Sequence, residues 1–216
     1  MEMFYPVYLN LKNKRVVVIG GGAVAERKVE SLIGTGAAIV VISPEVTSRL
    51  DSLAKVNHIQ LHRRPYSSGD CAGAALVFSA SDDAKVSASV FQEATNAGTF
   101  VNTADQPALC GFIMPAVVRR GDVAVAISTG GTSPGLAAQL RRKIGRIIGP
   151  EYAKLTQLLS KARLEIRRRV PDAEQRKALH YRILKSDIMD RLKRNDTVGA
   201  ERRLSEIIES AEEFHP

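Results

Sequence analysis

The first hundred residues alternate short apolar runs with longer segments of helix-forming composition. The runs are rich in Val and Ile, which is typical of strands buried on both faces of a parallel sheet. Strands are predicted at residues 15–19, 38–42, 59–62, 75–80 and 100–102. Helices are predicted between them, at residues 23–33, 47–55 and 82–97. Strands that alternate with helices predict an α/β fold with a doubly wound parallel sheet.

The pattern changes after residue 110. Two apolar runs, 111–118 and 123–128, flank a turn that contains Gly121, and this arrangement predicts an antiparallel hairpin. A helix is expected to follow, with Ser133 as its N-cap and Pro134 at its first position. The rest of the chain, to residue 215, has a mostly helical composition. Breaks in it are predicted near residues 149–150, 170–171 and 195–196.

A glycine motif joins the first predicted strand to the first helix. Gly20, Gly22 and Ala25 fit the pattern G-x-G-x-x-G/A, in which Gly20 permits a tight turn and Gly22 lets the backbone approach a pyrophosphate. Ala25 lets the helix pack close to the strand, and the helix N-terminus supplies free N–H groups for phosphates. The motif therefore predicts a Rossmann-like dinucleotide site. A glycine-rich turn without a ligand is the alternative.

Further cofactor contacts are expected where the neighbouring strands end, because ligands of open α/β sheets bind outside the carboxyl ends of the strands. Ser43 and Pro44 follow the second strand, and Ala80 and Ser81 follow the fourth. The acidic residue that commonly binds the ribose is absent at Ser43. No Arg lies beside Ser43 to bind a 2′-phosphate, so NAD is favoured over NADP.

One carboxylate, Asp105, follows the fifth strand and is predicted to lie beside the nicotinamide end of a bound dinucleotide. A dehydrogenase substrate must lose a proton as well as a hydride, and a carboxylate at this place could act as the general base. Asp105 could equally orient a substrate N–H or help to take up a metal ion. It could also be only a turn-forming residue ahead of Pro107.

The charge of the chain is uneven. The net charge is +8, and residues 141–169 contain ten Lys or Arg against two acidic residues. Such a segment attracts an anionic partner, either nucleic acid or a multiply charged metabolite, unless it is only a solvated helix face. Nucleic acid is disfavoured because aromatic residues are only 5% of the chain and Trp is absent. No nucleic-acid partner is therefore expected.

The cysteines and histidines predict neither disulfides nor a metal site. Cys71 and Cys110 are far apart in sequence and belong to no CxxC motif, and the four histidines are scattered. No run approaches the length of a membrane span, and the N-terminus lacks the pattern of a signal peptide. We expect a cytoplasmic protein without a resident metal and without a membrane partner.

Four ordered segments carry a specific resemblance. They are residues 18–28, 101–105, 112–116 and 128–134. In this order and spacing they are similar to the precorrin-2 dehydrogenase / sirohydrochlorin ferrochelatase family, the N-terminal module of siroheme synthases. The methyltransferase module of fused siroheme synthases is not in the sequence, so the stand-alone form is expected. Thr129 stands where some members have a second serine, which puts serine-based regulation in doubt.

The resemblance implies a fold, an activity and a set of site residues. The implied parts are an NAD-binding domain at residues 1–112, a dimerisation region at 113–147 and a helical C-terminal domain at 148–216. The implied reaction is NAD⁺-dependent oxidation of precorrin-2 to sirohydrochlorin, with Fe²⁺ inserted as a second substrate by some members. Asp105 matches the catalytic aspartate of the family, and its cofactor-contact positions are matched by Ala23, Val24, Ser43 and Pro44. Asn102, Thr132 and Ser133 are expected to contact the tetrapyrrole.

Two further expectations concern charge and assembly. Precorrin-2 is a polycarboxylate, so Arg119, Arg120 and the basic residues 141–146 could supply part of the field that attracts it. The apolar hairpin needs a cover, and a second copy of the chain is the favoured one, although the helical tail could serve instead. The competing functional hypothesis is an NAD(H) sensor that binds the nucleotide and turns over no tetrapyrrole.

Overall fold

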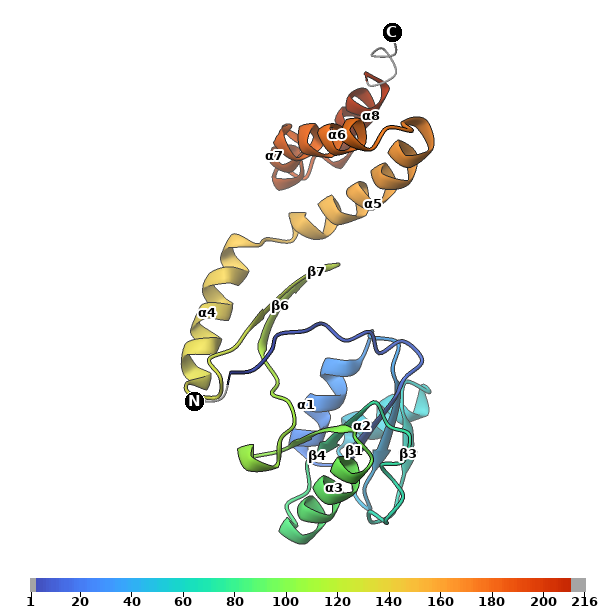
Figure 1. Cartoon of the computed structure of the whole chain (residues 1–216), viewed down its shortest axis with the longest axis vertical. Helices are drawn as coiled ribbons and strands as arrows, with labels where there is room; N and C mark the ends of the chain where they lie inside the picture. The colour runs from blue at the N-terminus through green and yellow to red at the C-terminus, as the bar shows by residue number, and fades with distance from the viewer. Residues whose placement is uncertain (1–2, 211–216) are drawn as a thin grey trace. The chain divides into compact units, whose positions relative to one another are not determined.

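The computed structural model describes residues 3–210, and the chain divides into two compact units, residues 1–114 and residues 115–216 (Figure 1). The first unit is built around a parallel sheet, and the second contains a two-stranded sheet and five helices among its described residues. Three parts were predicted from the sequence. The separation of residues 113–147 from residues 148–216 stays a prediction.

The sheet of the first unit has five parallel strands in the order β3-β2-β1-β4-β5. β1 (Arg15–Ile19) lies at the centre, between β2 (Ala38–Ile42) and β4 (Leu76–Ser79). β3 (Gln60–His62) and β5 (Phe100–Thr103) form the two edges. The predicted strands therefore exist, and the central ones are buried on both faces, as their Val- and Ile-rich runs indicate.

Helices cover both faces of this sheet. α1 (Ala23–Leu32) and α2 (Ser48–Lys55) pack with Val16 and Val18 in one apolar cluster. α3 (Ala84–Asn96) packs with Val17 and Ile19 in a second cluster on the opposite face. Successive residues of a strand point to opposite faces, so one β-branched run supplies both cores. The predicted doubly wound architecture is confirmed.

The segment after β5 differs from the prediction. Residues 111–118 were expected to form one strand, but β6 (Ala116–Arg120) begins only at residue 116. The chain first passes through a short 3₁₀ helix, η1 (Pro107–Leu109), and then returns along β5. There Cys110 forms an isolated antiparallel bridge with Asn102. The single apolar run therefore belongs to two structures. Its first residues lie along the edge of β5, its last residues form β6 of the hairpin, and Pro115 lies between them.

The predicted hairpin of the second unit is confirmed. β6 pairs antiparallel with β7 (Val123–Ile127). Gly121 has φ +57°, which fits a tight two-residue turn with glycine at its first central position. α4 (Pro134–Ile147) follows, and the hydroxyl of Ser133 accepts a hydrogen bond from the N–H of Leu136, as expected for an N-cap.

The rest of the second unit is a helical cluster. It consists of α5 (Glu151–Arg169), α6 (Ala173–Lys185), α7 (Ile188–Lys193) and α8 (Thr197–Glu209). One apolar core joins the four helices, and Ile166, Ile183 and Ile208 are among its fully buried members. The three predicted breaks are present. A further break, between α6 and α7, was not predicted, and the end of the predicted helical tail, near His215, lies outside the described residues.

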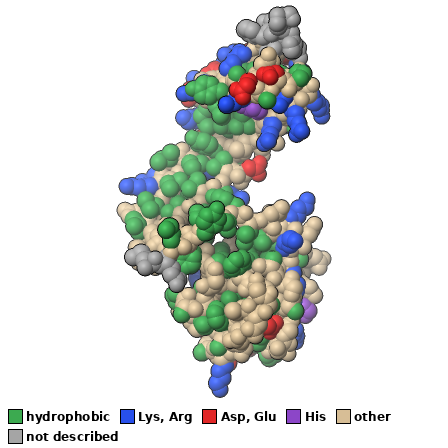
Figure 2. All heavy atoms as spheres, in the orientation of Figure 1, with side chains coloured by type: hydrophobic (Ala, Val, Ile, Leu, Met, Phe, Trp, Pro, Cys, Tyr) green, Lys and Arg blue, Asp and Glu red, His purple; other side chains and the backbone are tan. Residues whose placement is uncertain are grey.

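The surface of the second unit is mixed. On the face shown in Figure 2, Lys and Arg side chains gather with a few acidic ones over the helices α6 to α8. Large apolar side chains are also exposed in this unit, including Val117, Leu136 and Ile147, the last with 73% of its surface accessible. Among residues 3–210, no helix is long and apolar enough to span a membrane.

Candidate dinucleotide site

The carboxyl ends of β1, β2, β4 and β5 meet at one edge of the sheet, and backbone hydrogen bonds tie the segments beyond them together. The N–H of Gly20 donates to the carbonyl of Ile42 (2.9 Å), and the N–H of Ala80 donates to Ile19 (2.7 Å). The N–H of Ala104 donates to Ser79 (2.8 Å). The structure therefore brings the expected cofactor-contact segments and the segment before Asp105 to the same edge.

Two glycines are required by close packing at this edge. Gly20 has φ +118°, and a Cβ there would lie 2.3 Å from the carbonyl oxygen of Ala80. A Cβ on Gly21 would lie 1.9 Å from the carbonyl oxygen of Glu45. Neither position can hold a side chain without a shift of the backbone. The sequence analysis assigned a role to Gly20 but missed Gly21, although the run of three glycines was the available signal.

Gly22 has a different role, because a Cβ there would meet no atom within 4 Å. It is the N-cap of α1, and no side chain caps this helix. The first hydrogen bond at this end runs from the N–H of Glu26 to the Gly22 carbonyl (3.0 Å). The preceding N–H groups, including those of Ala23 and Val24, therefore lack helical acceptors. Ala25 is fully buried in the core, which lets α1 lie close to the sheet.

Ser43 is buried at the end of β2, and its hydroxyl donates to the carbonyl of Glu45 (2.6 Å). Pro44 follows in an exposed position. Arg49, the arginine that follows Ser43 most closely in the sequence, forms an ion pair with Glu30 (3.2 Å). The guanidinium is therefore already engaged, and this agrees with the expectation of NAD over NADP.

Ala80 and Ser81 lie on the other side of the glycine loop, directly before α3. The Ser81 hydroxyl accepts a hydrogen bond from the N–H of Asp83 (3.2 Å), and Asp83 in turn caps α3. The backbone of Ala80 is in close contact with Gly20, since a Cβ at that glycine would overlap the Ala80 carbonyl. Ala80 thus lies against the glycine loop, and the expected contact of Ala80 and Ser81 with a dinucleotide stays a prediction.

Asp105 lies beyond the end of β5, where it is exposed, and its backbone is left-handed, with φ +56°. This conformation is uncommon for a residue other than glycine, although Asp adopts it more readily than most. Asp105 belongs to a loop, residues 104–109, that we call the Asp105 loop. The Cys110 thiol closes this loop, because it accepts from the N–H of Thr103 and lies 3.4 Å from the carbonyl of Gln106.

Asn102 is buried on β5 and makes contacts that the sequence did not indicate. Its Oδ1 accepts a hydrogen bond from Nζ of Lys28 on α1 (3.0 Å), and its Nδ2 donates to the carbonyl of Phe112 (2.9 Å). Lys28 is half-buried, and burial lowers its pKa, while Cys110 and Asp105 oppose that shift. Sequence reasoning assigned Lys28 no role, because a lysine in a helix is usually a solvated surface residue.

The remaining predicted substrate contacts lie in the second unit. Ser133 uses its hydroxyl as the N-cap of α4, and its backbone N–H donates to the hydroxyl of Thr129 (3.1 Å). Thr132 is exposed in the loop before α4. The structure gives Ser133 a local structural role, and its expected contact with substrate stays a prediction.

Arg119 and Arg120 line a hollow of about 440 Å³ between β6 and α4, which we call the arginine hollow. Its full lining is Val117, Val118, Arg119, Arg120, Arg141, Arg142, Gly145 and Arg146, so it contains no acidic side chain. The guanidinium of Arg120 is held by the carbonyls of Gly145 (3.1 Å) and Arg119 (2.9 Å). The hollow therefore presents several cations with no lining carboxylate to neutralise them.

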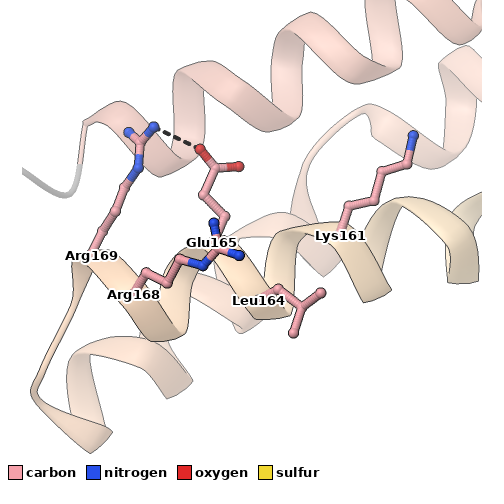
Figure 3. Close-up of a pocket in the computed structure, with 5 residues that line it drawn as sticks. All are labelled: Lys161, Leu164, Glu165, Arg168 and Arg169. Atoms are coloured by element: carbon pink, nitrogen blue, oxygen red, sulfur yellow. Dashed lines mark ion pairs between the residues drawn. The ribbon is translucent and has the colours of Figure 1, made fainter.

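A second hollow, of about 400 Å³, lies along α5 (Figure 3). Lys161, Leu164, Glu165 and Arg168 line it, together with Arg169, whose guanidinium is paired with Glu165 (2.7 Å). Leu164 is 62% exposed. This hollow follows one surface of a single helix and contains none of the predicted site residues.

The described part of the chain contains neither a disulfide nor a metal cluster. Cys71 and Cys110 are both free thiols. Within the described chain, no group of three His, Cys, Asp or Glu side chains could hold a metal ion.

The strand order, the glycine loop and the uncapped start of α1 together define a dinucleotide-binding protein of the Rossmann type. Residues 7–116 match the NAD(P)-binding domain family model, and the chain belongs to this family. Residues 120–147 match the central region of sirohaem biosynthesis proteins, and residues 151–208 match the sirohaem synthase dimerisation region. These matches confirm the resemblance found in the sequence. The dimerisation match falls on α5 to α8, whereas the sequence analysis expected pairing through residues 113–147.

Individual relatives agree with the family models. The chain is 34% identical over 213 residues to a siroheme synthase of Pseudomonas fluorescens, and the match covers 99% of this chain and 46% of that protein. It is 38% identical over 208 residues to a siroheme synthase of Ectopseudomonas mendocina, covering 96% of this chain and 45% of the relative. The chain thus spans about half the length of these curated relatives.

A solved structure named SirC, precorrin-2 dehydrogenase, is also similar. Its TM-score is 0.79 at 25% sequence identity, and the match covers 96% of this chain and 100% of the other.

Proposed function

We propose that this protein oxidises precorrin-2 to sirohydrochlorin with NAD⁺ as the hydride acceptor. The observation that carries the proposal is the shared sheet edge, where an uncapped helix start for phosphates and the segment bearing Asp105 meet. The similarity to a precorrin-2 dehydrogenase over nearly the whole chain supports this substrate. The name of the curated relatives, siroheme synthase, supports a place in siroheme formation.

The residues at the sheet edge fit a dinucleotide. Gly22 leaves space at the start of α1, and the free N–H groups there, with Ala23 and Val24, would bind the pyrophosphate. On one side the ribose would contact Ser43 and Pro44, and on the other side the dinucleotide would pass Ala80 and Ser81. NAD⁺, when bound, supplies the acceptor for a hydride.

Asp105 would remove the proton that the substrate loses together with the hydride. Asp105 is exposed beyond β5 and can therefore reach a substrate, and a carboxylate can hold the proton until solvent takes it. Asn102 is less free than the sequence suggested, because both ends of its amide are bonded within the protein. Its part in substrate binding would be indirect.

The arginine hollow would attract the carboxylates of the substrate. Arg119, Arg120 and the three arginines of α4 that line it contribute positive charge without a lining acid. Such a field raises the local concentration of a polyanion and weakens with added salt. We include Thr132 and Ser133 as substrate contacts in the same proposal, supported by their place in a motif of the family.

We extend the proposal to Fe²⁺ insertion into sirohydrochlorin, with iron as a substrate. The support is the name of the relatives, because siroheme is the iron form of that tetrapyrrole. Asp105 would accept the pyrrole protons that leave when the metal enters.

We further propose a homodimer in the cytoplasm. The match of residues 151–208 to a dimerisation region supports the dimer, as do the exposed apolar side chains of β6 and α4. The two free thiols agree with a reducing compartment.

The direct test is an assay with precorrin-2 and NAD⁺, with and without Fe²⁺. We expect NADH and the sirohydrochlorin spectrum to appear together, and the spectrum of siroheme to follow when Fe²⁺ is present. Asp105→Asn should reduce kcat by about 10²- to 10⁴-fold and leave NAD⁺ affinity unchanged. Asp190→Asn, at an exposed carboxylate on α7, serves as the matched control.

Each result has a clear meaning. Binding of NAD⁺ without any turnover would replace the enzyme by the NAD(H) sensor. Full activity of the Asp105→Asn variant would remove Asp105 from the role of base. Oxidation without iron insertion would restrict the function to the dehydrogenase.

A further inference from the structure

Lys28 has an unusual environment for a helical lysine. It is half-buried on the sheet-facing side of α1, with its Nζ 3.0 Å from Oδ1 of Asn102 and 5.6 Å from the centre of the Phe78 ring. No carboxylate of the described residues forms an ion pair with it. Burial disfavours the charged ammonium, so its pKa is lowered, against the opposing effect of Cys110 and Asp105 and together with the repulsion from Arg27.

The contact with Asn102 connects Lys28 to the far side of β5. The same amide donates through Nδ2 to the carbonyl of Phe112 (2.9 Å), and Nδ2 lies 3.6 Å from the Cys110 sulfur. Phe112 also packs edge-to-face on Phe78, with 5.4 Å between ring centres. One buried amide thus joins α1 to residues 110–112, which we call the return segment.

The return segment determines where the Asp105 loop ends. Gly111 donates its N–H to the carbonyl of Val101 (2.8 Å), and the N–H of Thr103 donates to the Cys110 sulfur (3.3 Å). These bonds close the loop whose left-handed residue is Asp105. If the return segment moved along β5, the loop and its carboxylate would move with it.

We propose that Lys28 is a positioning residue for Asp105: through the Asn102 amide, its ammonium fixes the return segment and so fixes the Asp105 loop. This proposal rests on the function proposed above only for the expected change in kcat. A neutral side chain of the same length would still cover Phe78, but it would leave the Oδ1 of a buried amide without its donor.

The first test follows the thiol of Cys110, which reports on the return segment without any need for substrate. In Lys28→Met we expect Cys110 to react with iodoacetamide about tenfold faster, because loss of a hydrogen bond from a charged group favours local opening. The fully buried Cys71 is the internal reference, followed by mass spectrometry of its own peptide. Lys14→Met is the matched control, since Lys14 is exposed at the opposite end of the sheet.

The second test measures turnover of the full chain. We expect Lys28→Met to lower kcat about 10- to 100-fold, because a small misplacement of a catalytic group has effects of that size, and to leave the NAD⁺ affinity unchanged. Lys28→Arg retains a charged donor and should restore both kcat and slow labelling. Combining Lys28→Met with Asn102→Leu should add little to the larger single effect, because both changes remove the same Lys28–Asn102 hydrogen bond.

The outcomes separate the two proposals. Labelling of Cys110 at the wild-type rate in Lys28→Met would overturn the positioning role. Loss of kcat with unchanged labelling would also overturn it, because Lys28 would then act on the substrate itself. If the wild-type chain fails to oxidise precorrin-2, the proposed function falls, and the labelling still decides whether Lys28 fixes the loop. If Lys28→Met does not fold, Lys28→Leu, which also lacks a donor, repeats both measurements.

Discussion

α1 and α3 start at the same edge of one sheet, after neighbouring strands, yet their ends are treated in opposite ways. At α3, the carboxylate of Asp83 accepts from the N–H groups of Lys85 (2.7 Å) and Val86 (3.4 Å). At α1, Gly22 offers no side chain and the N–H groups stay open. The protein therefore satisfies one helix start with its own negative charge and leaves the other without a capping side chain, at the place where we propose that the pyrophosphate binds.

The same contrast holds further along the two helices. Glu93 of α3 is bonded within the protein, because it accepts from the N–H groups of Gly69 (3.1 Å) and Cys71 (2.7 Å) and from the Tyr66 hydroxyl. Among the described residues, Lys28 of α1 has one hydrogen-bond acceptor, the amide oxygen of Asn102. Saturated polar contacts on α3 stabilise the fold, whereas the incomplete contacts on α1 are those expected of a helix that serves a site.

The largest expected effect is on folding. Gly20→Ala would force a Cβ against the carbonyl of Ala80 at a backbone φ that alanine avoids, and it should destabilise the first unit by about 3 kcal/mol or more. Gly22→Ala is the matched control and should change stability by only about 0.5 kcal/mol, because its Cβ meets open space. Urea-dependent labelling of the buried Cys71 thiol measures both, and equal stability of the two variants would contradict the packing argument.

The next prediction concerns a substitution that makes the start of α1 resemble the capped start of α3. Gly22→Asp should weaken NAD⁺ binding about 100-fold or more, because the new carboxylate would occupy the N–H groups and repel the pyrophosphate. Gly22→Asn caps without the charge and should weaken binding less. Calorimetric titration with NAD⁺ measures the difference, and unchanged affinity of Gly22→Asp would exclude the start of α1 as the phosphate site.

Alkaline pH should lower the free energy of unfolding through Cys71, whose N–H is bonded to Glu93 of α3. Burial raises the pKa of the Cys71 thiol from 9.0 to about 12, helped by the charge of Glu93. A pKa raised in the folded state means that this stability is complete below pH 9 and is lost as the pH rises through 12. The free energy of unfolding should fall by about 1.4 kcal/mol per pH unit from this one group. Urea unfolding followed by circular dichroism should show a shallower pH slope for Cys71→Ala, and equal slopes would count against this assignment.

The smallest effect concerns the capped helix. Asp83→Ala removes the N-cap of α3 and should destabilise the first unit by about 1 kcal/mol. NAD⁺ affinity should stay at the wild-type value, because α3 provides no open N–H groups to the ligand in the wild type. Thermal unfolding measures the loss of stability, and NAD⁺ titration of the same sample measures the affinity. A large loss of affinity would show that the two helix starts act together.

Much of the site could be anticipated because it depends on local chemistry. Gly20, Gly22 and Ala25 lie within six residues and need only a strand before them and a helix after them. The role of Lys28 could not be anticipated, since its partner Asn102 is 74 residues away in the chain. The sequence assigned Cys110 to neither a disulfide nor a metal site, and only the folded chain shows that it closes the Asp105 loop.

The amino-acid sequence by itself determined the strands and helices, the parallel sheet, the hairpin and the glycine loop, because each follows from periodicity or from a residue with special backbone freedom. It did not determine where the run after residue 110 divides, or that Gly21 packs against Glu45, or which polar groups share the buried Asn102 amide. Those features depend on distances between segments that are remote in the chain. Packing density and the need to satisfy buried polar groups set such distances only after the chain has folded.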